Sequence, residues 1–186
     1  MPRHDKSPPL WYLPGTRMRR PPLPVVLIAV LLLALGATAG VVMSPLRARA
    51  ERFALARIAA NPDVHGLTGS PEYDDEVRAR TVFLVEAGVS FLHAHAEGLG
   101  PVVLLAASLV ATAVPGRRRR GVLHALLAAG GLFPLGYLVY ALAVLERGRD
   151  AGVALAETWV LTPLGTAAIL GLVGLVLAWD RRAPAS

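Results

Sequence analysis

Three ionisable side chains, His93, His95 and Glu97, fall within five residues of an otherwise apolar stretch of this chain. Histidine and carboxylate side chains bind zinc, copper and iron, and histidine is also a common axial ligand of haem iron. Polar groups at the edge of a hydrocarbon layer are costly, so they usually have a partner or a function. This segment is therefore the first candidate for a binding site.

Helical spacing divides the cluster between two faces. Residues two apart on an α-helix point about 200° apart, so His93 and His95 cannot readily share one metal ion. His93 and Glu97 are four residues apart and share a face, on which Glu86 and Ser90 also fall. The sequence therefore predicts a polar stripe of Glu86, Ser90, His93 and Glu97, with His95 on another side of the helix.

A metal site would need further ligands, because three or more protein ligands are typical of zinc, copper and iron sites. The candidate metal ligands are His93 and Glu97 first, His95 next, and then the carboxylates Glu86 and Glu157. Glu146 and Asp150, which precede Glu157 in the predicted second outer loop, are further candidates. This set suits copper, zinc or haem, and the residues do not choose among them. A haem held by two histidines of one subunit would need His124, which is predicted near the opposite membrane surface.

The stripe has three other interpretations. Intramembrane acids and histidines often form relays, which would make the chain a small transporter of protons or ions. Water, lipid headgroups and the stripe's own members would otherwise satisfy it without any ligand. Ser90, His93 and Glu97 are also the residue types of a hydrolytic triad, but one regular helix rarely gives the required geometry. Whether the protein is an enzyme is left open.

The composition places this stripe in a membrane protein. Apolar residues make up 54% of the 186 residues, and the mean hydropathy is +0.52. Four long apolar runs, at 22–43, 81–115, 121–145 and 158–179, are typical of transmembrane helices. The expected fold is an all-α membrane protein, a bundle of four transmembrane helices with a helical extracytoplasmic segment between the first two. Cysteine is absent, which excludes thiolate metal sites and disulfides.

Positive charge gathers at the predicted membrane boundaries. Lysine and arginine are concentrated in residues 1–21 and in the loop 116–120, whereas acidic residues outnumber arginines in 44–97 and 146–157. Because lysine and arginine mark the cytoplasmic side, both termini and the Arg117–Arg120 loop are predicted to be cytoplasmic. Four arginines between two apolar helices are too cramped for nucleic acid, so no nucleic-acid partner is expected. The high arginine and alanine content suits a bacterial inner membrane.

Residues 44–80 are the predicted extracytoplasmic segment. Ser44-Pro45 is a helix-start signal. Apolar residues recur after it at helical spacing with arginines between them, which predicts a short amphipathic helix that ends near Asn61. His65 follows in a loop, where it is expected to be solvated. Ser70-Pro71 starts another helix, and acids crowd its first turns, where they suit the positive end of the helix dipole better than a calcium site.

The second apolar run is too long for a single straight crossing. Residues 81–115 would extend about 50 Å as one helix, and a hydrocarbon core is only about 30 Å thick. We expect one long helix, kinked near Gly98, Gly100 and Pro101. Pro134 is expected to kink the third transmembrane helix. Residues 146–157 are expected to form a second outer loop, and residues 180–186 are expected to form a cytoplasmic tail.

The first apolar run is predicted to be an uncleaved anchor. Ala37-Thr38-Ala39 resembles a signal-peptide cleavage site, but the apolar run continues past it to Met43. Gly36 and Gly40 form a small-residue pair suited to close helix packing, and Ala167 and Gly171 form another in the fourth run.

These features predict a small polytopic membrane protein, a non-catalytic or accessory subunit with a metal or haem contact at its outer rim. The alternatives are a purely structural or assembly subunit that packs on a larger complex through its small-residue seams, and a small transporter. The expected partners are the lipid bilayer and either other membrane subunits or further copies of the chain.

Overall fold

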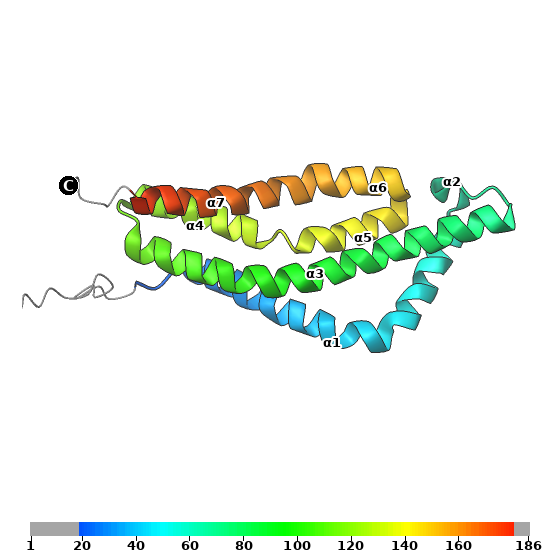
Figure 1. Cartoon of the computed structure of the whole chain (residues 1–186), viewed down its shortest axis with the longest axis horizontal. Helices are drawn as coiled ribbons and strands as arrows, with labels where there is room; N and C mark the ends of the chain where they lie inside the picture. Colours follow the sequence, from blue (N-terminus) through cyan, green and yellow to red (C-terminus); the bar gives the residue numbers. More distant parts are fainter. Residues whose placement is uncertain (1–18, 181–186) are drawn as a thin grey trace, which may run out of the picture.

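The protein is an all-α membrane protein built from four long helical rods that lie side by side (Figure 1). The computed structural model describes residues 19–180, and within that range there is no strand. All four rods are long and apolar enough to cross a membrane, as the sequence predicts. The predicted N-terminal tail, residues 1–21, and the predicted C-terminal tail, residues 180–186, lie almost entirely outside the described residues.

The first rod, α1, is a single helix over Leu23–Ala60. The predicted helix start at Ser44-Pro45 is wrong, because Pro45 lies inside α1. A proline in a helix interior removes one backbone hydrogen bond and bends the helix. Helix α1 runs away from its neighbour α3 as far as a bend in its cyan part and then turns back toward α3 (Figure 1). The expected amphipathic helix is therefore the far half of α1. Asn61 ends it, and the short helix α2, Pro62–His65, follows.

The second rod, α3, covers Pro71–Ala113 without interruption. It begins at Pro71 after Ser70, as the sequence predicts, and continues through Pro101. Its 43 residues correspond to about 64 Å of helix, far more than a hydrocarbon core. The helix therefore carries the whole polar stripe on one continuous element and projects beyond the membrane.

The other two rods are each made of more than one helical segment. The third consists of α4, Arg117–Gly131, and α5, Leu135–Arg147. The break between them ends at Pro134, the residue that the sequence predicts to interrupt this helix. The fourth consists of α6, Arg149–Ala156, a π-helical turn η1, Glu157–Leu161, and α7, Thr162–Asp180. The predicted outer loop 146–157 is wrong, because Gly148 alone reverses the chain with φ of +77° and both flanks are helical.

Small residues let the rods approach closely. A Cβ added at Gly36 would lie 3.0 Å from the Cβ of Ala96 on α3, and one at Gly130 on α4 would lie 2.4 Å from the Cα of Ala168 on α7. Gly171 likewise packs against Leu127. The small-residue seams that the sequence offered for packing on a larger complex are thus occupied within the chain.

The two ends of the bundle differ. The turn into Arg117–Arg120 and the ends of the described chain lie at one end, here called the Arg-loop end (Figure 1). Helix α2 lies at the other end, here called the α2 end (Figure 1), and Gly148 lies there too, against Val64 of α2. Near the Arg-loop end the rods share a core of small and branched apolar residues: Val25, Ala29, Val103, Ala107, Val110 and Leu127.

Candidate functional site

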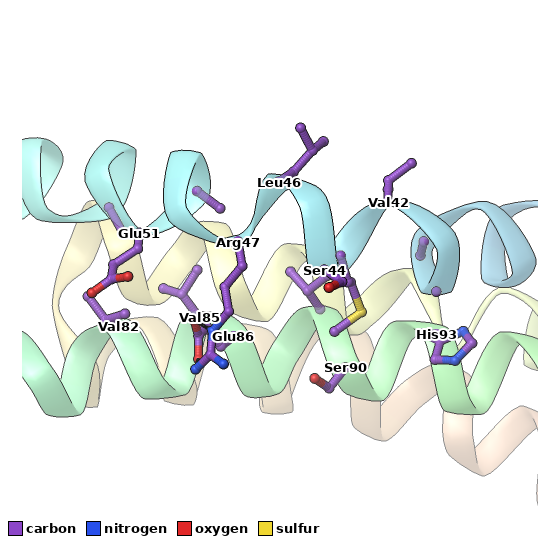
Figure 2. Close-up of a pocket in the computed structure, with 16 residues that line it drawn as sticks. Val42, Ser44, Leu46, Arg47, Glu51, Val82, Val85, Glu86, Ser90 and His93 are labelled. Carbon is purple, nitrogen blue, oxygen red and sulfur yellow. Dashed lines mark hydrogen bonds and ion pairs between the residues drawn. The ribbon is translucent and has the colours of Figure 1, made fainter.

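A groove of about 720 Å³ lies between α1 and α3, toward the α2 end (Figure 2). Most of its wall is apolar, and its polar side chains are Ser44, Arg47, Glu51, Glu86, Ser90 and His93. Three of the four residues of the predicted stripe therefore share one concave surface. Figure 2 shows Arg47, Glu86 and Ser90 between the two helices.

The groove exists because α1 touches α3 at two places and bends between them. On one side, Gly36 and Gly40 bring the helices together. On the other, Ala54 and Ile58 of α1 form a small apolar cluster with Leu145 of α5, and Val82 and Val85 of α3 pack against this cluster. The bend at Pro45 separates the helices between these contacts, and the space widens from the glycines toward the bend.

Arg47 and Glu86 form an ion pair across the groove. The Arg47 Nε lies 3.0 Å from Glu86 Oε1, and its Nη2 lies 3.2 Å from Oε2. Two parallel hydrogen bonds of this kind fix the orientation of both side chains. The pair places one positive and one negative charge together, so it adds no net charge to the groove. Sequence patterns did not indicate this partner for either residue.

His93 is held from two sides at the narrow end of the groove. Its Nδ1 lies 2.8 Å from the backbone oxygen of Gly36 and 3.6 Å from Glu97 Oε1. A carbonyl oxygen can only accept, so Nδ1 carries the proton and donates it to Gly36. In the neutral ring, Nε2 is then a hydrogen-bond acceptor. A Cβ at Gly40 would lie 2.6 Å from the ring carbon Cε1, so the ring needs a glycine beside it.

Ser90 differs from the other hydroxyl residues of the rods. Thr38, Thr81 and Ser108 each donate to a backbone oxygen four residues earlier in their own helix. Among the described residues Ser90 makes no such bond, and its half-buried hydroxyl lines the groove. The Ser90 hydroxyl is therefore available both as a donor and as an acceptor.

His95 lies on another face of α3, as helical spacing predicts. Its Nδ1 contacts the backbone oxygen of Phe91 at 2.9 Å. Its ring centroid lies 4.8 Å from that of Tyr137 and 5.5 Å from that of Phe133, both on the third rod. His95 is therefore part of an aromatic cluster between α3 and α5 and is not among the groove residues.

The five candidate metal ligands do not meet at one point. Glu86 is paired with Arg47, Glu97 is beside His93, His95 packs on aromatic rings, and Glu157 lies in η1 on the fourth rod. Within residues 19–180 no group of three or more histidine or acidic side chains is placed to hold a metal ion. Glu146, the further carboxylate, is paired with Arg57 of α1.

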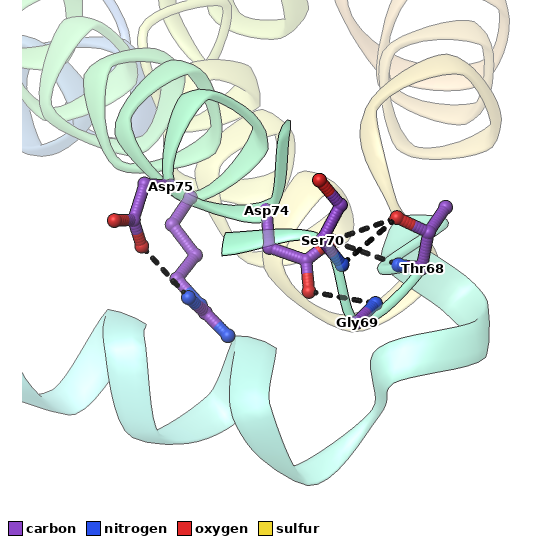
Figure 3. A network of polar contacts seen from close by, with 6 residues as sticks. Thr68, Gly69, Ser70, Asp74 and Asp75 are labelled. Carbon is purple, nitrogen blue, oxygen red and sulfur yellow. Dashed lines mark hydrogen bonds and ion pairs between the residues drawn. The ribbon is translucent and has the colours of Figure 1, made fainter. Parts of the chain in front are cut away.

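Polar contacts at the α2 end stabilise the turn that precedes α3. Asp74 accepts hydrogen bonds from the amides of Thr68 at 2.8 Å and Gly69 at 3.0 Å (Figure 3). These amides hold the pKa of Asp74 below its usual range. The carboxylate thus organises the turn before α3, in line with a capping role for these acids.

His65 is buried, which corrects the expectation that it is solvated. Its Nε2 lies 3.1 Å from the backbone oxygen of Leu145, so the ring ties α2 to the end of α5. Nδ1 has no hydrogen-bond partner among the described residues. The short α2 segment gave no sequence signal for this burial, because the contact depends on how α5 and α6 are joined.

The fold and the groove together define the class of this protein: a four-helix membrane protein with a polar-lined groove between its first two rods. Comparison with protein-family models, with curated proteins and with solved structures found no match.

Proposed function

We propose that the protein is a non-catalytic, accessory membrane subunit that binds a lipid-soluble amphiphile in the groove between α1 and α3. The observation that carries this proposal is the groove itself, about 720 Å³ of mostly apolar space with a few polar groups from both helices. Ligand pockets of this size combine apolar walls with a few placed polar groups in the same way.

The depth of the groove in the bilayer supports an amphiphile. From His93 to Ala113, the end of α3, the helix extends about 30 Å, which is about the thickness of a hydrocarbon core. With the Arg-loop end at one membrane surface, His93 lies at the opposite edge of the hydrocarbon, and Arg47 and Glu86 lie among the headgroups. A molecule in the groove would then have its polar end at the interface and its apolar part toward the lipid.

We assign the groove to the extracytoplasmic side of a bacterial inner membrane, with both termini in the cytoplasm. The support is the arginine-rich turn at Arg117–Arg120, because such turns face the cytoplasm. The protein would take its ligand from the outer leaflet and present it to other membrane subunits.

Binding fits the geometry better than hydrolysis or transport. Ser90 and His93 make no hydrogen bond to each other, so they lack the contact between nucleophile and base that a hydrolase needs. A proton or ion path would have to continue toward the Arg-loop end, where α1 and α3 bury the apolar residues Ala29, Val103 and Ala107.

The test is to purify the protein gently from its native membrane and to quantify what is extracted with it. Val89 lines the groove, and Val89→Trp should fill it; Val102→Trp, on the same helix but exposed and outside the groove, is the matched control. We expect one amphiphile per chain in the wild type and Val102→Trp and a loss in Val89→Trp. Equal retention in all three would refute the proposal. A stoichiometric metal ion or haem, detected by elemental analysis or a visible spectrum, would refute it in favour of a metal centre.

A further inference from the structure

A cleft of about 380 Å³ lies between the first turns of α4 and the last turns of α7, at the Arg-loop end of the bundle. Arg118 and Arg119 line the part of the cleft nearest the turn, and its other lining residues are apolar: Val122, Leu123, Gly174, Leu177 and Ala178. A Cβ added at Gly174 would lie 2.6 Å from Leu123 Cδ2, so the two helices close the cleft at the end farther from the arginines. The cleft therefore combines a basic end with an apolar end.

The basic end of the cleft carries an excess of positive charge. None of the exposed residues Arg117–Arg119 forms an ion pair with another side chain that the structure describes. Arg120 donates to the backbone oxygen of Val114 at 3.3 Å. The sequence between residues 98 and 145 contains no acid, and Asp180, at the end of α7, adds one negative charge against four positive ones. Because such an excess attracts anions, the charge at this end favours an anionic ligand.

The depth of the cleft in the bilayer matches a phospholipid. Trp159 in η1 and Trp179 near the end of α7 are both exposed, and about 30 Å of helix separates them, which is about the thickness of a hydrocarbon core. Tryptophan side chains favour the two membrane interfaces, so Trp179 marks the edge of the hydrocarbon at the Arg-loop end. The arginines of the cleft then lie among the headgroups, and Gly174 lies inside the hydrocarbon.

We propose that this cleft binds an anionic phospholipid of the leaflet at the Arg-loop end, with the phosphate at Arg118 and Arg119 and an acyl chain directed toward Gly174. Arginine binds phosphate oxygens through two parallel hydrogen bonds. Basic pockets between transmembrane helices bind anionic headgroups in the same way. A zwitterionic lipid is the weaker ligand, because it would bring its own ammonium group beside the arginines. This site is separate from the groove between α1 and α3, which lies toward the other end of the bundle.

The experiment measures how strongly bromine-labelled lipids quench the tryptophan fluorescence of the full-length protein in nanodiscs. Trp11→Phe/Trp159→Phe leaves Trp179 as the reporter beside the cleft, and Trp11→Phe/Trp179→Phe leaves Trp159 as the reporter at the opposite membrane edge. The nanodiscs contain phosphatidylcholine and increasing fractions of labelled phosphatidylglycerol or labelled phosphatidylcholine. At Trp179 we expect phosphatidylglycerol to be favoured about fivefold, the factor that one arginine contributes near an anionic lipid surface. At Trp159 we expect no preference.

Two matched double variants separate the cleft from a general attraction to positive charge. Arg118→Gln/Arg119→Gln should remove the preference at Trp179. Arg19→Gln/Arg20→Gln removes the same charge from the same end of the bundle, where the amide of Arg19 donates to Thr112 of α3, but outside the cleft, and should leave the preference unchanged.

Three results would overturn the inference. They are equal quenching by the two lipids at Trp179, an equal preference at Trp159, and an equal loss of preference in the two double variants. Each of these results concerns the Arg-loop end alone, so the amphiphile function proposed for the groove stands or fails by its own extraction experiment.

Discussion

Replacing Gly40 by alanine tests the way the site is assembled. The new Cβ would lie 2.6 Å from His93 Cε1, 3.0 Å from Nδ1 and 3.1 Å from Nε2. The ring must therefore move and give up its 2.8 Å hydrogen bond to Gly36. Overpacking costs about 1–3 kcal/mol, and the lost hydrogen bond costs about 0.5–1.5 kcal/mol. The gain in helix propensity from glycine to alanine offsets about 1 kcal/mol.

The net expectation for Gly40→Ala, from these three terms, is a loss of about 0.5–3.5 kcal/mol in the free energy of unfolding. Gly98→Ala on α3 is the matched control, because nothing lies within 4 Å of a Cβ at that position. Reversible unfolding in mixed micelles measures both variants, and Gly98→Ala should be neutral or stabilising.

A double-mutant cycle shows whether the His93 ring is the cause. In a His93→Ala background there is no ring to displace, so Gly40→Ala should cost little there and the two substitutions should be strongly non-additive. Additive effects, or a Gly40→Ala variant as stable as Gly98→Ala, would refute the packing of His93 on α1.

Three further predictions concern the rest of the bundle. Arg47→Glu should reduce amphiphile retention by placing two acids at the groove, and the exchanged pair Arg47→Glu/Glu86→Arg should restore it, as measured by extraction. The pKa of Asp74 is held below its ordinary value of 3.8. Its carboxylate therefore contributes stability above that value, and this stability is lost as the pH falls through the folded-state pKa. Thermal unfolding between about pH 3 and 7 should show that Asp74→Asn is less stable than wild type at neutral pH and depends less on pH in the acid range. Gly148→Ala should lower the melting temperature, because φ is +77° and the new Cβ would lie 2.4 Å from the backbone oxygen of Val64, whereas Gly121→Ala meets nothing within 4 Å.

Helical periodicity was enough to predict which side chains share a face. The positions of Glu86, Ser90 and His93 on one side of α3, and of His95 on another, follow from 3.6 residues per turn alone. The extent of that helix followed from the continuous apolar run and from the start signal at Ser70-Pro71. Local patterns of this kind act within one element and need no knowledge of its neighbours.

The partners of these side chains could not be predicted in the same way. The Arg47–Glu86 pair depends on the bend at Pro45 and on the register between two helices. Ser44-Pro45 is ambiguous in sequence, because proline both starts helices and is tolerated inside membrane helices. Glu146 and the residues after it looked like a loop because they are charged, but Gly148 with its positive φ makes the turn by itself.

The central claim is that a lipid-soluble amphiphile occupies the groove between α1 and α3. A crystal structure of the protein purified from its native membrane and grown in a lipidic mesophase tests it most directly. We predict elongated density along Val89, with its polar end beside Arg47 and Glu86 and its apolar part toward the hydrocarbon. A groove closed by contact of α1 with α3, or one filled only by water, would contradict the account.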